Sequence, residues 1–394
     1  MTRVAVNSQI LQWAMQRSGQ PVTLHRKFPK LFEWLKGESQ PTLRQLERLA
    51  QATATPFGYF FLPEPPQDQL SIPYYRTKGD LHSLNPSPDL VATVQTMELR
   101  QMWMRDYLIN EGHEPLPFVG SVGINEEPVK VAKQIREALG LSGGWAVTQP
   151  NWSAALRQLR QRIEEAGVLV VTNGIVGNNT KRKLNVKEFR GFILIDEYAP
   201  LIFINGADAK AAQMFTLAHE LAHVWLGRSA IFDLWEFQPA EERIEQACNC
   251  IAAEFLVPQD DLRQFWPSMA HELGRFQQVA QRFKVSELVA ARRALDLELI
   301  TKSEFSRFYQ TYMERERRAA KNLDGGGNFY STQRYRVGRR FAIAVVRAAK
   351  EGKLLYREAY RLTGLYGKTF EQFSELVRIG FFRELNWASL KGKQ

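Results

Sequence analysis

Cysteine is scarce in this chain of 394 residues, which contains two cysteines and six histidines. Cys248 and Cys250 lie two positions apart on a predicted helix and point to different sides, so they are poorly placed to form a disulfide. This usage excludes a disulfide-stabilised secreted scaffold and is typical of cytoplasmic proteins. We expect both cysteines to be small core residues. The alternative is that oxidation of a cysteine regulates a nearby site.

Long hydrophobic runs are also missing, and no segment approaches the length of a membrane span. The first residues show no signal-peptide pattern. Hydrophobic residues make up 44% and charged residues 24% of the chain, which is ordinary for a soluble globular protein. We therefore expect a cytoplasmic protein without a membrane partner.

Charge is unevenly distributed along the chain, whose net charge is +10. Residues 1–60 hold 8 basic and 3 acidic residues (+5), and residues 311–394 hold 18 basic and 8 acidic residues (+10). The remaining 26 basic and 31 acidic residues, in 61–310, give −5. Basic ends suggest an anionic partner, and nucleic acid is the first candidate. For the C-terminal end, solvated surface cations are an equal alternative.

The most informative motif is His219-Glu220-x-x-His223, in a chain that has few histidines. Two histidines four apart share one helix face, about 6 Å apart along the axis, so both imidazoles can reach one metal ion. Glu220 lies close enough to take a proton from a metal-bound water. The alternative is a core helix whose two histidines have hydrogen-bonding partners within the protein and bind no metal. It is disfavoured because residues 215–226 are apolar nearly all round, and a buried helix seldom carries such groups uncoordinated.

Catalytic zinc usually takes three protein ligands and leaves a fourth position open. Carboxylates are abundant after the motif: Glu236, Glu241, Glu242 and Glu245. Glu245 begins a helical run in which Asn249, Ala252 and Ala253 share its stripe. The two small residues would let this helix approach the metal helix closely. Spacing and pattern therefore favour Glu245 as the third ligand over a solvated glutamate.

The region from His219 to Pro258 resembles the ImmA/IrrE family of metallo-endopeptidases. Segments 167–171, 173–178, 188–192 and 203–206 are also similar to that family, and the resemblance covers roughly 125–310. It implies a compact zincin-type fold with His219, His223 and Glu245 as metal ligands and Glu220 as general base. It also implies that the protein cleaves helix-turn-helix repressors or is needed for their cleavage. The chain departs from the family pattern at Cys248, where alanine is usual, and at Ile251, where phenylalanine is common.

The first 60 residues predict short helices joined by tight turns, at about 10–18, 31–37 and 41–52. They resemble a repressor-type helix-turn-helix domain. The polar recognition helix of such domains is not readable, so binding to DNA and docking onto a protein of similar fold remain open alternatives. Residues 279–295 also predict helix–turn–helix, which we interpret as packing within the peptidase domain rather than DNA reading through Arg292 and Arg293.

The middle of the chain predicts a small sheet among helices. Helices are expected at 87–111, 127–139 and 152–166, and strands at 168–172, 189–196 and 200–204. In zincins a strand at the sheet edge beside the metal helix holds the substrate, and one of the strands between 189 and 204 is the expected one. Arg190 and Asn205 are candidates for binding the carbonyl oxygen in the transition state, although structural roles are favoured.

These observations predict a mostly helical α+β protein whose zincin-like metallopeptidase domain, a small sheet with the metal helix, is flanked by helical domains. The expected parts are a helix-turn-helix-like domain (1–62), a proline-rich linker and helix (63–124), the peptidase domain (125–310) and a basic helical appendage (311–394). The predicted function is a zinc-dependent endopeptidase that cleaves a protein, a helix-turn-helix transcriptional repressor, with Mn²⁺ as the alternative to Zn²⁺. The alternative function is a DNA-binding transcriptional regulator, or a toxin–antitoxin or prophage switch partner, with a non-catalytic metallopeptidase-like domain.

Overall fold

The computed structural model describes residues 3–18, 21–66, 70, 86–232, 243–268, 272, 274–319 and 329–379. The chain divides into two compact units: one holds the described residues up to 95, and the other holds those from 96 onward. Helix α5 (Pro88–Asn110) contributes residues to both. The finer boundaries at 62, 124 and 310 stay predictions.

The first unit is helical, as its sequence predicts. Its core is formed by apolar side chains spaced three and four apart, among them Ile10, Ala14, Trp34 and Leu46, all at most 2% exposed. Thr42 caps helix α4 with a capping box, in which its side chain and that of Gln45 each accept the other's backbone N–H. Besides the first residues of α5, the described helices of this unit are α1 (Ser8–Arg17), α2 (Pro21–Lys27), α3 (Leu31–Lys36), α4 (Leu43–Ala52) and the 3-10 helix η1 (Phe57–Phe61).

The second unit is built on a mixed sheet with the strand order β1-β5-β4-β6. β1 pairs with β5 in parallel, whereas β4 is antiparallel to both β5 and β6. Both strands expected between 189 and 204 are therefore interior, so the prediction that one of them offers a free edge is wrong. The later segment β6, which sequence periodicity missed, occupies that edge. The strands are β1 (Leu169–Asn173), β4 (Gly191–Leu194), β5 (Leu201–Asn205) and β6 (Ala230–Phe232), beside a hairpin of β2 (Ile175–Val176) and β3 (Asn179–Lys183).

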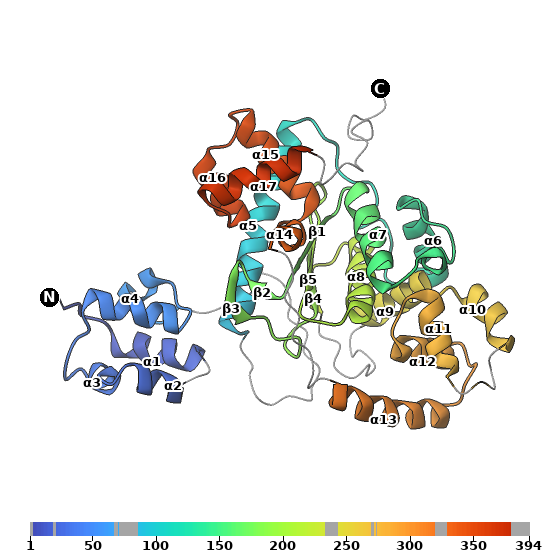
Figure 1. Ribbon diagram of the computed structural model, residues 1–394, viewed down its shortest axis with the longest axis horizontal. Helices are drawn as coiled ribbons and strands as arrows, with labels where there is room; N and C mark the ends of the chain where they lie inside the picture. The colour runs from blue at the N-terminus through green and yellow to red at the C-terminus, as the bar shows by residue number, and fades with distance from the viewer. Residues whose placement is uncertain are drawn as a thin grey trace. The chain divides into compact units, whose positions relative to one another are not determined.

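Both faces of the sheet are covered, which explains the imperfect alternation of its sequence. Ile193, Ile202 and Ile204 join the core that contains the metal-motif helix. The intervening side chains point to the opposite face, where the rings of Phe192 and Phe203 stack with centroids 4.9 Å apart. Figure 1 shows helices α7 (Trp152–Glu165) and α8 (Lys210–Leu226) on one side of the sheet and α14 (Phe329–Val337) on the other.

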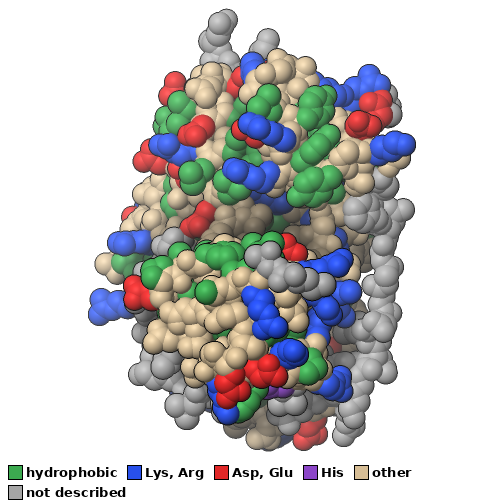
Figure 2. Space-filling model, turned by 90° about the vertical axis from the view of Figure 1, so that its left-hand side faces the viewer, with side chains coloured by type: hydrophobic (Ala, Val, Ile, Leu, Met, Phe, Trp, Pro, Cys, Tyr) green, Lys and Arg blue, Asp and Glu red, His purple; other side chains and the backbone are tan. Residues whose placement is uncertain are grey.

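The C-terminal helices belong to the same compact unit as the sheet. α14 and α15 pack against β1, and the buried Arg100 of α5 donates to the backbone oxygens of Arg336 and Leu362 at 2.8 and 2.9 Å. Apolar and basic side chains alternate on the outer face of these helices (Figure 2), with Tyr356 and Tyr366 52% and 66% exposed. The helices are α15 (Arg339–Lys350), α16 (Tyr356–Thr363) and α17 (Gly367–Ile379).

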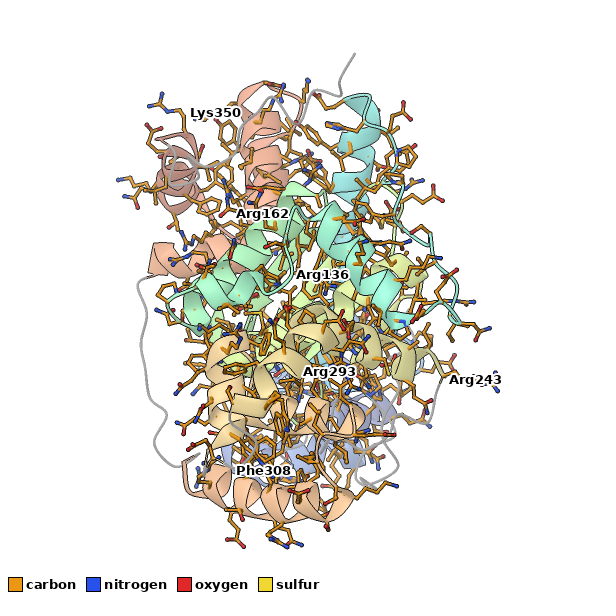
Figure 3. The ribbon with its side chains drawn as sticks, turned by 90° about the vertical axis from the view of Figure 1, so that its right-hand side faces the viewer. Arg136, Arg162, Arg243, Arg293, Phe308 and Lys350 are labelled. Atoms are coloured by element: carbon orange, nitrogen blue, oxygen red, sulfur yellow. The ribbon has the colours of Figure 1, made fainter. Side chains whose placement is uncertain are left out.

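Helix α9 (Arg243–Leu256) packs against α8, and two arginines hold its C-terminal end. Arg136 of α6 (Pro128–Ala138) donates to the backbone oxygen of Glu254 at 3.0 Å. Arg293 of α12 (Glu287–Asp296) donates to the oxygen of Val257 at 3.0 Å and forms a buried ion pair with the Glu254 carboxylate. Both arginines are labelled in Figure 3. Cations at the last helical carbonyls satisfy groups that have no partner within the helix.

The buried ion pair agrees with the interpretation of residues 279–295 as a packing element, because Arg293 is occupied within the protein. For Arg292, which lies at the surface, that interpretation stays a prediction. The other described helices around the core are α6 (Pro128–Ala138), η2 (Trp145–Thr148), α10 (Gln259–Phe265), η3 (Trp266–Ser268), α11 (Arg275–Phe283), α12 (Glu287–Asp296) and α13 (Lys302–Ala319). None of the helices in the described ranges combines the length and apolarity that crossing a membrane requires.

Replacing Arg293 by alanine should lower the free energy of unfolding by about 3–5 kcal/mol, because it leaves the Glu254 carboxylate buried without its partner. Chemical denaturation measures this change. The neighbouring Arg292 pairs with Asp296 on the surface at 2.9 Å, where both side chains are more than one-third exposed. Arg292→Ala, the matched control, should cost about 0.5 kcal/mol or less. Equal effects of the two substitutions would contradict the assigned role of Arg293.

Candidate metal centre

Helix α8 carries the His-Glu-x-x-His motif in its last two turns and ends at Gly227, whose φ of 65° is the left-handed conformation that favours glycine. The apolar residues of α8 pack against other elements on nearly every side of the helix, so the three polar side chains of the motif are shielded from solvent. His219, Glu220 and His223 are each 0% exposed. Such burial of ionisable groups calls for partners or a bound cation.

Glu245 approaches the two imidazoles from the first turn of α9. The Nε2 atoms of His219 and His223 lie 3.1 Å apart. The Glu245 carboxylate places one oxygen 3.1 Å from His219 Nε2 and the other 3.3 Å from His223 Nε2. The structure thus brings together the three side chains predicted as metal ligands, from two helices packed side by side.

The electrostatics of this cluster fit a divalent cation. Burial lowers the pKa of His219, although Glu245 opposes the shift, so the neutral imidazole that a metal requires is favoured. Burial alone would raise the pKa of Glu245, but hydrogen bonds and charge from His219 and His223 together hold it well below its usual range. Two nitrogen lone pairs and a carboxylate converging within 3.3 Å form the nitrogen and oxygen donor set that zinc uses in catalytic sites.

Glu220 sits beside the donor set without a hydrogen-bonding partner for either carboxylate oxygen among the described residues. Burial and the nearby charge of Glu245 raise the pKa of Glu220 well above its usual value. The sheet closes in from the other side: a Cβ at Gly191 would lie 2.7 Å from Thr216 Cγ2 and 3.1 Å from Glu220 Oε1. Glycine at the start of β4 therefore lets the sheet approach this carboxylate. An orphaned buried carboxylate of raised pKa is a feature of functional sites.

Asn249 orients one imidazole, a role that the sequence analysis did not assign. The Nδ1–H of His219 donates to Asn249 Oδ1 at 3.0 Å. This bond fixes the tautomer whose Nε2 lone pair points toward His223 and Glu245. One feature of the sequence could have indicated this role: Asn249 lies one turn after Glu245 on the same face of the helix.

The two cysteines differ in environment. Cys248 is buried, as expected, whereas Cys250 is exposed, so the prediction of a core position is wrong for Cys250. The helix turns Cys250 away from α8. The metal-binding atoms of Cys248, His219 and His223 all lie within 4.8 Å of one another, a proximity that the sequence analysis did not predict. Burial and the charges of Glu245 and Glu220 raise the pKa of the Cys248 thiol.

The remaining candidates have structural roles or lie outside the described residues. Arg190 pairs with Asp208 at 2.5 Å. The buried Asn205 side chain donates to the Phe189 backbone oxygen at 3.1 Å and accepts from the Ala207 N–H. Both observations agree with the favoured structural interpretation. The alternative ligands outside the described residues are Glu236, Glu241 and Glu242.

Comparison with known proteins places this site within a peptidase-like segment. Residues 163–295 match the family described as the IrrE N-terminal-like domain, a peptidase family, and residues 337–375 match a domain of unknown function. A stretch of 81 residues is 40% identical to the radiation response metalloprotease IrrE of Deinococcus radiodurans. The stretch covers 19% of this chain and 23% of that protein. No solved structure matches the chain. The matches suggest a metallopeptidase domain.

Replacing Asn249 by alanine should weaken Zn²⁺ binding about 10–100-fold, because His219 loses the acceptor that orients its ring. Competition against a chromophoric chelator measures the dissociation constant. Gln246→Ala is the control, since Gln246 is an exposed residue of the same helix. Unchanged zinc affinity in Asn249→Ala would remove Asn249 from the metal centre.

Proposed function

We propose that this protein is a metal-dependent endopeptidase whose active site lies between α8 and α9. The convergence of His219, His223 and Glu245 within 3.3 Å, beside the orphaned carboxylate of Glu220, carries this proposal. The matches to the IrrE N-terminal-like domain and to a metalloprotease support it. They span only part of each chain, so they support a reaction class and not a particular substrate.

His219 and His223 through Nε2, and Glu245 through its carboxylate, would hold the metal, and Zn²⁺ suits this donor set best. The cation, when bound, supplies Lewis acidity toward water and toward the carbonyl of the scissile peptide bond. Glu220 accepts the proton of the attacking water, and the raised pKa of its carboxyl suits it to that task. The same carboxyl then donates the proton to the leaving amine.

The position of the sheet suggests where a peptide substrate binds. β6 directly follows α8 in the chain and ends the strand order among the described residues. A peptide added along its outer edge would gain backbone hydrogen bonds, which form whatever the side chains of the peptide are. Contacts with those side chains would then select among sequences. We therefore propose β6, in place of the strands of 189–204, as the edge strand that binds the substrate peptide. A helix-turn-helix repressor remains the proposed protein substrate, on the strength of the family resemblance.

Replacing Glu220 by glutamine should lower the cleavage rate about 10²–10⁴-fold while zinc binding persists, because the amide cannot accept the proton of water. The zinc-loaded full chain would be incubated with the repressor encoded by a neighbouring gene, and cleavage would be followed by mass spectrometry. The matched control is Glu137→Gln on α6, whose side chain is 65% exposed. A Glu220→Gln protein that cleaves at the wild-type rate would refute the assignment of the base.

The basic N-terminal unit favours one alternative, a DNA-binding regulator in which the metal centre is structural. Its first 60 residues carry 8 basic and 3 acidic residues. A gel-shift titration with genomic fragments at several salt concentrations distinguishes the two functions. Specific DNA binding that survives removal of the metal, together with no proteolysis by the wild-type chain, would favour the regulator.

A further inference from the structure

The thiol of Cys248 faces the same centre as the three candidate ligands. Cys248 follows Glu245 by three positions on α9, so both side chains lie on the helix face that packs against α8. Its metal-binding atom and those of His219 and His223 all lie within 4.8 Å of one another. The side chain is 0% exposed, so it is shielded from bulk solvent together with the imidazoles.

These separations are within coordinating range. A zinc ion bound at about 2.3 Å from sulfur and about 2.0–2.1 Å from nitrogen holds the two atoms roughly 3.5 Å apart in a tetrahedron. From 4.8 Å or less, that spacing requires the atoms to approach by up to about 1.3 Å, which a side-chain rotation provides.

We propose that Cys248 is a fourth protein ligand of the metal centre, which then holds the ion by His219, His223, Glu245 and the Cys248 sulfur. The inference rests on the proposed metal site and adds to it. Binding releases the thiol proton to solvent, since the thiolate is the coordinating form. Four protein ligands leave no open position, as in structural zinc sites, whereas catalytic sites keep one for water. The resting centre is thus closed, and the peptidase works only when the sulfur has left the ion.

Cobalt substitution tests this ligand directly, because Co²⁺ takes the place of zinc and reports its donors by absorption. The full-length protein, stripped of metal, would be titrated with Co²⁺ as wild type, Cys248→Ala, Cys248→Ser and Cys250→Ala. We expect a near-ultraviolet sulfur-to-cobalt charge-transfer band in wild type and in Cys250→Ala, the matched control, because Cys250 faces away. The band should be absent from both Cys248 variants. The chain has only these two cysteines, so a band present in both wild type and Cys250→Ala identifies the Cys248 sulfur even where a Cys248 variant folds poorly.

The outcomes separate this inference from the proposed function. Visible cobalt bands with no charge-transfer band in wild type would overturn the Cys248 ligand and leave the metallopeptidase standing. A wild-type protein that binds no cobalt would overturn both. If the inference holds, Cys248→Ala should bind zinc at least about tenfold more weakly, since removing a direct ligand costs no less than removing an orienting residue. When zinc is saturating, this variant should cleave peptide bonds faster than wild type, because its centre keeps an open position for water.

Discussion

The close packing of α8 against α9 is the constraint on which the rest of the structure depends. It brings two imidazoles and a carboxylate from separate helices within 3.3 Å of one another and removes them from water. Burying charged groups costs several kcal/mol per ion after relaxation. A divalent cation held among these donors, as proposed, would offset that cost in the folded chain alone, because the unfolded chain has no preformed site. Metal binding would then be coupled to folding, and the centre would stabilise the same helix pair that creates it.

Two groups of contacts fix the helix pair at opposite ends. On the sheet side, Gly191 lets β4 approach α8 so closely that a methyl group at this position would collide with Thr216 of that helix. On the far side, Arg136 and Arg293 bind the C-terminal carbonyls of α9. The ligands thus stand on helices and not on loops, and their separation is set by packed elements with little freedom to shift.

The features of the fold and the site that depend on local periodicity could be predicted from the sequence. The four-residue spacing of His219 and His223 determines a shared helix face in any context, and the stripe of Glu245, Asn249 and Ala252 identified the face of the second helix. The helix and strand positions in the middle of the chain followed from the same patterns. Features that depend on tertiary packing were missed or wrong. β6 is too short to show a period, Cys250 carries no signal of exposure, and the approach of the Cys248 sulfur to the imidazoles depends on how the helices cross.

The same packing makes the character of the centre sensitive to one side chain. The resemblance implies alanine at the position of Cys248, and a methyl group there would leave a bound ion three protein ligands and an open position. A thiol at that position offers a fourth donor with no change in the backbone, the helices or the other ligands. Open three-ligand sites perform hydrolysis, whereas closed four-ligand sites stabilise structure. The fold alone therefore does not determine whether this centre is catalytic at rest. Under the proposed Cys248 ligation, that property would depend on the distance between one sulfur and the ion, which a small rotation within a rigid helix pair would change.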